Sequence, residues 1–160
     1  LYSSAASDVY KRQMISIDTN LLIAALAPGH AMHEKARVWL EAQSNRNDVI
    51  ISEFVLVELF TLLCNPVVLS APLIAKDAVT VCQSFRLHPN WRLLGFCPDS
   101  SKIHNALWEK ASSKNFARRR IYDVLLALTL LEFGVTEFAT VNTKYFKTLG
   151  FKKVWNPLSE

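Results

Sequence analysis

Short apolar runs alternate along this chain with longer segments in which apolar residues recur at helical spacing. The short runs have the length and the branched or aromatic content of strands, at residues 14–17, 49–51, 91–96, 138–141 and 154–155. The longer segments predict helices over residues 21–26, 33–43, 52–64, 70–85, 100–108 and 121–133, with a short helix or turn at 143–149. This alternation predicts an α/β fold with a mainly parallel sheet.

The first apolar run ends on a carboxylate, in the sequence MISIDTNLLI. Asp18 follows the predicted strand at its C-terminal end, and Thr19 and Asn20 precede an apolar helical segment. In open α/β sheets the carboxyl ends of the strands form the ligand crevice, so Asp18 is a candidate for chemistry. Aspartate is also a preferred residue at the start of a helix, and capping alone explains Asp18 equally well.

Two further acids and one amide occupy comparable places. Glu58 lies within the apolar helical segment FVLVELFTLL, where we expect its carboxylate to have little access to bulk water. Asp123 lies near the start of the apolar helix RIYDVLLALTLLEF, and Asn142 follows the strand FATV. Taken singly, each has an ordinary explanation: pairing of an acid with a basic residue, such as Arg119 or Arg120 for Asp123, or a turn for Asn142.

Taken together with Asp18, these residues indicate a metal site. We expect all four to lie at strand ends or in helices that directly follow strands, which brings them to one edge of one sheet. Converging carboxylates are the ligands that Mg²⁺ or Mn²⁺ requires. His30 and His33 are three residues apart, but with no third ligand nearby in sequence a surface pair explains them better than a metal site.

The composition fits one globular domain. The chain has 160 residues, of which 51% are hydrophobic and 20% charged, and its formal charge of +4 suits an anionic partner such as nucleic acid. Residues 1–13 lack a Met and apolar periodicity, so we predict a non-native or disordered N-terminal extension followed by a single domain over residues 14–160. No apolar run approaches the roughly 18 residues that span a bilayer, and the cysteines have no metal-type spacing. We therefore expect a soluble, cytoplasmic protein without a membrane partner.

The segments around the four candidate residues resemble a known family. IDTNLLI around Asp18, SEFVLVELF around Glu58, RIYDVLLALT around Asp123 and TVNTKYF around Asn142 resemble, in this order, the PIN-domain nucleases, and more narrowly the VapC-type toxins of toxin–antitoxin pairs. The resemblance covers nearly the whole chain after residue 13. It implies a PIN-like three-layer sandwich, with a mainly parallel five-stranded sheet and helices on both faces, and metal-dependent endoribonuclease activity.

The resemblance also implies how the catalytic site is composed. Asp18, Glu58 and Asp123 would bind Mg²⁺ or Mn²⁺, and Asn142 would complete the catalytic set at a position where many relatives have aspartate. Asparagine offers a carbonyl oxygen without the charge, so we expect one firm metal site and a weaker second one completed by substrate, or a single working metal.

Substrate and protein partners follow from the same resemblance. Asn20 and Thr140 would line the pocket next to the acids, where the RNA substrate lies. The basic segment 112–120 suits RNA phosphates, and we assign the substrate contacts there to Arg119 and Arg120. A cognate antitoxin and a homodimer are the protein partners that the resemblance implies.

Two other readings fit part of the sequence. A small-molecule phosphohydrolase of the haloacid-dehalogenase kind would use Asp18 as a nucleophile, but that class needs a second aspartate two positions on, where this chain has Asn20. A non-catalytic RNA- or protein-binding module on a degenerate PIN scaffold is favoured by the neutral Asn142. The scarcity of glycine, four in all, argues against a nucleotide-cofactor fold.

Overall fold

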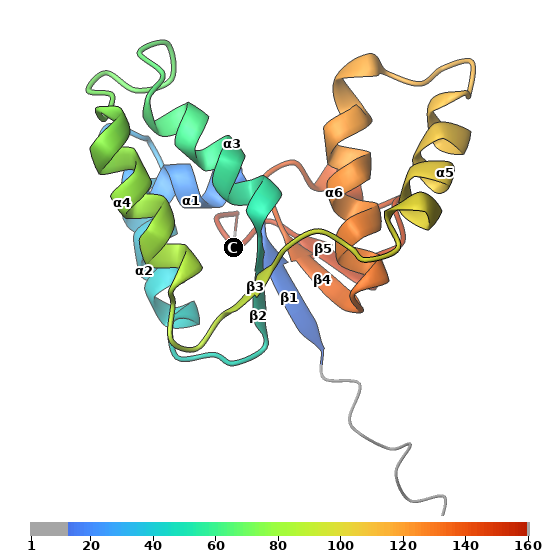
Figure 1. Ribbon diagram of the computed structural model, residues 1–160. Coiled ribbons are helices and arrows are strands. Elements are labelled where there is room, and N and C mark those ends of the chain that lie inside the picture. Colours follow the sequence, from blue (N-terminus) through green and yellow to red (C-terminus); the bar gives the residue numbers. More distant parts are fainter. Residues whose placement is uncertain (1–12, 160) are drawn as a thin grey trace, which may run out of the picture.

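The protein is described by a computed structural model over residues 13–159, so the predicted N-terminal extension lies outside the described residues apart from Gln13. The strands within this range are β1 (Met14–Ile17), β2 (Val49–Ser52), β3 (Arg92–Leu94), β4 (Val135–Ala139) and β5 (Lys153–Trp155). They form one parallel sheet in the order β3-β2-β1-β4-β5 (Figure 1). The predicted five-stranded parallel sheet is thereby confirmed.

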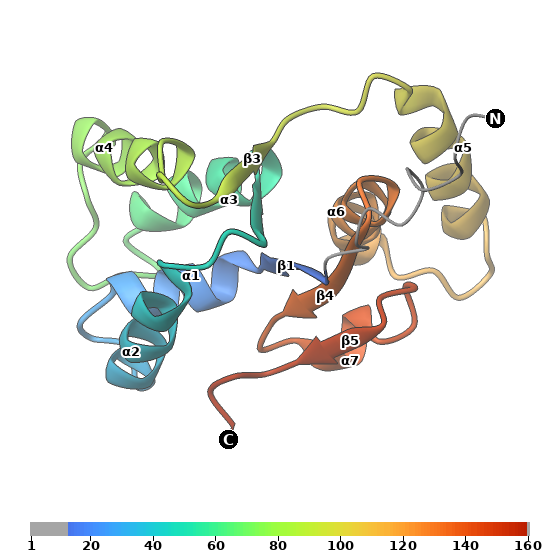
Figure 2. The ribbon, with the colours of Figure 1, turned by 90° about the horizontal axis from the view of Figure 1, so that it is seen from below.

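Helices flank the sheet on both sides. Those in the described residues are α1 (Thr19–Leu26), α2 (His33–Gln43), α3 (Glu53–Leu63), α4 (Ala75–Arg86), α5 (Ser100–Ala111), α6 (Ile121–Glu132) and α7 (Thr143–Phe146), with a 3₁₀ turn η1 (Arg118–Arg120) before α6. In two perpendicular views, α1 to α4 gather on one side of the molecule and α5 with α6 on the other (Figures 1 and 2). None of these helices is both long enough and apolar enough to cross a membrane.

Strand β1 lies at the centre of the sheet, between β2 and β4. Ser16 pairs with Ile50 on one side and with Phe138 on the other. Ile15 and Ile17 are almost completely buried, because a central strand of a parallel sheet is covered on both faces. They belong to one core that also includes side chains of α1, α3 and α6. Since all strands run the same way, the carboxyl ends of β2, β1 and β4 lie side by side at one edge.

Several predicted boundaries were misplaced. Helix α4 begins at Ala75 and not near residue 70, because the Leu73 N–H donates to the Leu63 carbonyl at 2.8 Å and holds the preceding segment against the end of α3. Strand β4 begins at Val135, three residues earlier than predicted, since Gly134 adopts a φ of +83° that lets the chain turn directly from α6 into the strand. Strand β3 is also shorter than the predicted segment 91–96.

Candidate active site

Asp18 stands at the carboxyl end of the central strand, where the sequence placed it. Its backbone N–H donates to the Ala139 carbonyl at 2.9 Å, which extends the β1–β4 pairing by one residue. Its side chain is 7% exposed, and carboxylate oxygen Oδ2 accepts hydrogen bonds from Asn20 Nδ2 at 2.8 Å and from Thr140 Oγ1 at 2.5 Å. The ends of two neighbouring strands therefore fix this carboxylate in one orientation.

Thr140 connects the residues around Asp18. It directly follows β4 and is fully buried. Its hydroxyl donates to Asp18 and accepts from Asn20 Nδ2 at 3.1 Å and from the Asn142 N–H at 2.9 Å. The Asn20 side chain completes the network, because its Oδ1 accepts from the Val141 N–H at 3.2 Å. The two predicted pocket residues, Asn20 and Thr140, thus both contact Asp18.

Glu58 reaches the site from α3, but its environment differs from the prediction. The residue is exposed, so the expectation that its carboxylate is shielded from water is wrong. Helix α3 buries Val55 and Leu59 and turns Val57 and Glu58 to solvent. Val57 is apolar yet 65% exposed, so the solvent-facing side of this helix cannot be recognised from the pattern of apolar and polar residues.

Thr19 ties Glu58 to the edge of the sheet. Its hydroxyl donates to Glu58 Oε2 at 2.6 Å, although the two residues are 39 positions apart in the sequence. The Thr19 side chain is 1% exposed, so this carboxylate oxygen is drawn toward a buried donor beside Asp18. Thr19 was not among the predicted site residues, and its position directly after Asp18 is the only signal for it in the sequence.

Asp123 approaches the same edge from the first turn of α6. Helix α6 follows η1 and precedes β4, so the expectation that every candidate residue lies at a strand end or in a helix following a strand is wrong for Asp123. A helix that leads into a parallel strand runs against the strand direction, which places its N-terminus at the carboxyl edge of the sheet. Asp123 therefore comes near the other acids by a different route.

The acids perturb one another electrostatically. The pKa of Asp18 is raised to about 6, chiefly by burial and also by the carboxylates of Glu58 and Asp123, while the hydrogen bonds from Thr140 and the Thr19 backbone act in the opposite direction. The pKa of Asp123 is also raised, first by burial and then by Glu58, whereas Arg120 lowers it. The three acids are therefore close enough to repel one another, and a cation between them would relieve that repulsion.

The carboxylates at this edge fit a divalent metal, but they do not form a complete set of protein ligands around one ion. Carboxylate oxygens are the ligands preferred by Mg²⁺ and Mn²⁺, and Mg²⁺ commonly keeps several waters while binding only one or two carboxylates. In residues 13–159, no three His, Cys, Asp or Glu side chains are grouped so that they could hold one ion together. The arrangement thus fits an ion bound at Asp18, with Glu58 and Asp123 as neighbours at longer range or through water.

The two predicted phosphate-binding arginines differ from each other. Arg119 is exposed and forms no ion pair with any described residue. Arg120 donates through one guanidinium nitrogen to the Tyr145 carbonyl and lies over the Tyr145 ring, 5.3 Å from its centroid. It does not form an ion pair with Asp123. Arg120 therefore links the start of α6 to α7, whereas Arg119 is available to a ligand.

Asn142 lies next to this network but contributes only its backbone to it. It is exposed and precedes α7, and its side chain makes no capping hydrogen bond to that helix. Its N–H is the group that donates to Thr140. The amide side chain therefore belongs to the same edge of the sheet as Asp18, but no capping hydrogen bond holds it in one orientation.

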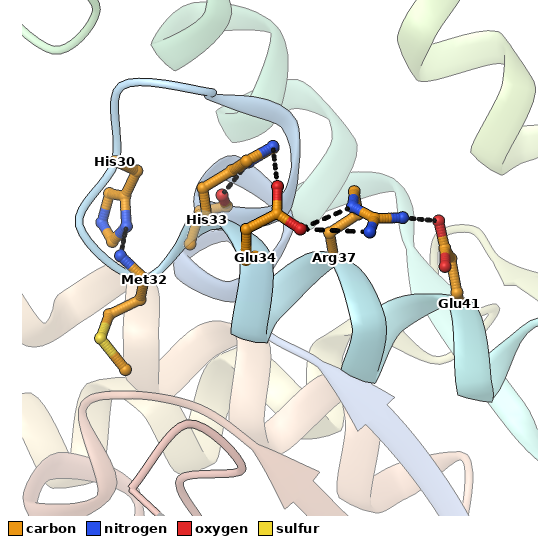
Figure 3. A network of polar contacts seen from close by, with 7 residues as sticks. His30, Met32, His33, Glu34, Arg37 and Glu41 are labelled. Atoms are coloured by element: carbon orange, nitrogen blue, oxygen red, sulfur yellow. Dashed lines mark hydrogen bonds and ion pairs between the residues drawn. The ribbon is translucent and has the colours of Figure 1, made fainter.

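The two histidines do not form a metal site with described residues (Figure 3). His30 Nδ1 accepts a hydrogen bond from the Met32 N–H at 3.1 Å. His33 Nδ1 lies 3.2 Å from the Ala24 carbonyl, and its other ring nitrogen lies 3.7 Å from Glu34. Glu34 continues the row along α2 toward Arg37 and Glu41. Each imidazole therefore has its own hydrogen-bond partner within the chain.

Comparisons with known proteins identify the family of this chain. The PIN domain family model matches residues 15–152. Over 146 residues the chain is 42% identical to the protein named Ribonuclease VapC24 in two strains of Mycobacterium tuberculosis, covering 91% of this chain and 98% of the relative.

Solved structures share the fold at lower sequence identity. VapC20 of Mycobacterium tuberculosis, described as a sarcin–ricin loop cleaving toxin, superposes with a TM-score of 0.62 at 23% identity, covering 86% of this chain and 95% of that one. FitAB bound to a DNA fragment gives a TM-score of 0.62 at 22% identity, covering 91% and 96%. VapBC2 of Rickettsia felis, bound to a promoter DNA fragment, gives 0.61 at 17% identity, covering 89% and 98%. These likenesses confirm the predicted fold, and with the family match they show that the chain belongs to the PIN domain family as a homologue of the VapC-type proteins.

Proposed function

We propose that this protein is a divalent-metal-dependent endoribonuclease that hydrolyses RNA phosphodiester bonds and acts in the cytoplasm as the toxin of a toxin–antitoxin pair. The observation that carries the proposal is the buried carboxylate of Asp18, whose pKa is raised to about 6 by burial and by the charges of two further acids. A nuclease needs such a concentration of negative charge to recruit the cation that binds its substrate phosphate. The 42% identity to a protein named as a ribonuclease supports the same activity.

Asp18 would hold Mg²⁺ or Mn²⁺ directly, and Glu58 and Asp123 would assist at longer range or through water. When bound, the ion would lower the pKa of a coordinated water and stabilise negative charge on the phosphate. The chain's own part is to orient the acids: Asn20 and Thr140 fix the Asp18 carboxylate, and Thr19 draws Glu58 toward it. Asn142 would offer a neutral oxygen to a second ion or to an attacking water, which favours one firm metal site.

RNA would approach over the basic segment before α6. Arg119 is exposed and free of ion pairs with described residues, so its guanidinium suits a substrate phosphate. Arg120 would contribute its charge beside Asp123 while remaining attached to Tyr145. Asn20 would line the floor under the scissile phosphate, and the buried Thr140 would support it from below.

An antitoxin is the proposed protein partner, with a homodimer as the assembled form. A cavity of about 780 Å³ supports a peptide-binding role because its lining is mostly apolar and includes Ile23, Leu26, Leu63, Leu69 and Val81. None of the candidate catalytic residues lines it. Co-expression with the neighbouring small open reading frame should relieve growth arrest and give a stable complex, and Leu69→Glu should weaken that complex about tenfold. Leu87→Glu, at an exposed leucine outside the cavity, is the matched control.

The decisive experiment is cleavage of structured and unstructured RNAs with and without Mn²⁺. Wild type should cut only with the metal, Asp18→Ala should not cut, and Asp77→Ala, at an exposed aspartate of α4, should cut like wild type. Cleavage by a clean Asp18→Ala preparation would remove Asp18 from the mechanism. RNA binding without cleavage or Mn²⁺ binding would favour the non-catalytic module, and a phosphorylated Asp18 would favour the phosphohydrolase.

A further inference from the structure

The net positive charge of this protein is concentrated in one short segment, residues 108–122, which we call the hairpin tip. This segment contains five basic residues and one acid, whereas the whole chain contains 18 basic and 14 acidic residues. By formal count the hairpin tip therefore carries the entire net charge of +4, and the rest of the chain is neutral. A local excess of this kind attracts a polyanion to one place on the surface.

Most cations of the hairpin tip are unpaired. Lys110, Lys114, Arg118 and Arg119 are exposed and form no ion pair with any described residue. Elsewhere several basic residues are ion-paired: Arg37 pairs with two glutamates of its own helix, and Lys102 pairs with Glu132. Only Arg120 of the tip is occupied, by Tyr145. The tip therefore presents a cluster of cations that no described acid pairs with.

Two large aromatic side chains stand at the same end of the hairpin. Helices α5 and α6 pack against each other and are joined through residues 112–120 (Figure 1). Trp108 lies three residues before the end of α5, and Tyr122 is the second residue of α6. Their exposed fractions are 60% and 77%, so neither is needed for the core. Tyr122 also directly precedes Asp123, so it belongs to the same first turn of α6 that brings this acid to the edge of the sheet.

Free cations combined with exposed aromatic rings are the elements of a single-strand binding surface. Cations contact the phosphates, and the rings stack on unpaired bases, which duplex RNA keeps within its own helix. We propose that the hairpin tip is the docking surface for single-stranded RNA, with Arg118 and Arg119 on phosphates and with Trp108 and Tyr122 stacked on bases next to the cleaved bond. This inference rests on the proposed ribonuclease function and specifies where on the protein the RNA substrate binds.

The test measures binding of a short single-stranded RNA in the Asp18→Asn background, so that the probe is not cut. Affinity is determined over a range of salt concentrations. The Arg118→Gln, Arg119→Gln double variant should reduce the salt slope by about 1.4, because each single-strand phosphate contact contributes about 0.7. Tyr122→Leu and Trp108→Leu should each weaken binding about fivefold or more without changing the slope, and phenylalanine at either position should restore it.

Two controls separate docking from unspecific effects. A Lys76→Gln, Lys152→Gln double variant removes two exposed lysines outside the tip and should leave affinity and slope unchanged. An RNA lacking the base at the stacked position should bind wild type and Tyr122→Leu equally. A midpoint of thermal unfolding equal to that of wild type would show that each variant is folded.

The outcomes decide between this inference and the proposed function. Wild-type affinity in the arginine double variant or in both leucine variants would overturn the docking surface, as would equal losses for a duplex of the same sequence. Loss of antitoxin binding in these variants with unchanged RNA binding would assign the surface to a protein partner and overturn the inference. If the tip variants lose RNA binding but wild type never cuts RNA with Mn²⁺, the docking surface stands and the nuclease proposal fails.

Discussion

Asp18 and Asp123 are carboxylates at the same edge of one sheet, yet Asp18 is held by two side-chain hydrogen bonds and Asp123 by none that involves a described residue. Asp18 is buried and follows the central strand, whereas Asp123 is half-buried on a helix that reaches the edge from the other side. The difference indicates that the β1 side of the site is preorganised by the fold. On the α6 side, no hydrogen bond from a described residue fixes the Asp123 carboxylate in the same way.

The largest predicted effect separates the two aspartates directly. Asp18→Asn should lower the RNA cleavage rate about a thousandfold, because it removes the charge of the fixed ligand. Asp123→Asn should lower the cleavage rate less, about a hundredfold. Excess Mn²⁺ should recover part of the activity, because no hydrogen bond from a described residue fixes the Asp123 carboxylate. Cleavage rates across a Mn²⁺ titration test this. Equal losses that no metal concentration recovers would show that the two sides are equally preorganised.

The second prediction concerns stability and pH in the presence of a chelator. The pKa of Asp18 in the folded protein is about 6, above the ordinary value of 3.8, so the folded state favours the protonated acid. This contribution to the free energy of unfolding is complete below about pH 4 and is lost as the pH rises through about 6, a loss of about 3 kcal/mol.

Denaturant unfolding measured from acidic to neutral pH checks the sign of this effect. Asp18→Asn lacks the titration, so it should be more stable than wild type near neutral pH, and the difference should shrink as the pH falls. Asp77→Asn, at an exposed position of α4, should follow wild type. A wild type that gains stability relative to Asp18→Asn between about pH 4 and 7 would contradict burial as the dominant influence on the Asp18 carboxylate.

A third prediction tests whether the Thr19 hydroxyl positions the Glu58 carboxylate for metal binding. Thr19→Val removes the hydroxyl at nearly constant shape and frees Glu58 Oε2, so Mn²⁺ affinity measured by calorimetry should fall about fivefold. Thr19→Ser should restore it. Thr129→Val is the matched control, because Thr129 is also buried but donates to the Leu125 carbonyl within α6. Equal effects of both valine variants would attribute the change to general destabilisation.

The smallest predicted effect concerns the unfixed Asn142. Asn142→Asp adds a charge at an exposed position, where solvent screens it, so the Mn²⁺ concentration for half-maximal cleavage should fall only about threefold. The stoichiometry of bound Mn²⁺ should rise toward two if this residue belongs to a second ion site. Unchanged metal binding and activity would place residue 142 outside the catalytic set.

The sequence predicted those features that are encoded locally. The strand ending at Asp18 and the helix after it form a continuous pattern, and both appear as predicted. The exposure of Glu58 was not predictable, because the apolar Val57 shares the solvent-facing side of α3. The contact of Thr19 with Glu58 was also hidden, since it depends on how β1 and α3 meet. The early start of β4 depends on the left-handed conformation of Gly134, which the sequence only permits.

The pairing of β1 with β4 also affects when the protein becomes active during its synthesis. Asp18 emerges from the ribosome early, but Thr140, which holds its carboxylate, is 122 residues further along the chain. Domains generally fold as units while synthesis proceeds from the N-terminus, and a nascent chain that stops before β4 leaves the first strand without its neighbour. A truncated translation product that lacks β4 therefore cannot assemble the acidic edge. The site forms only after β4 and Thr140 have been synthesised.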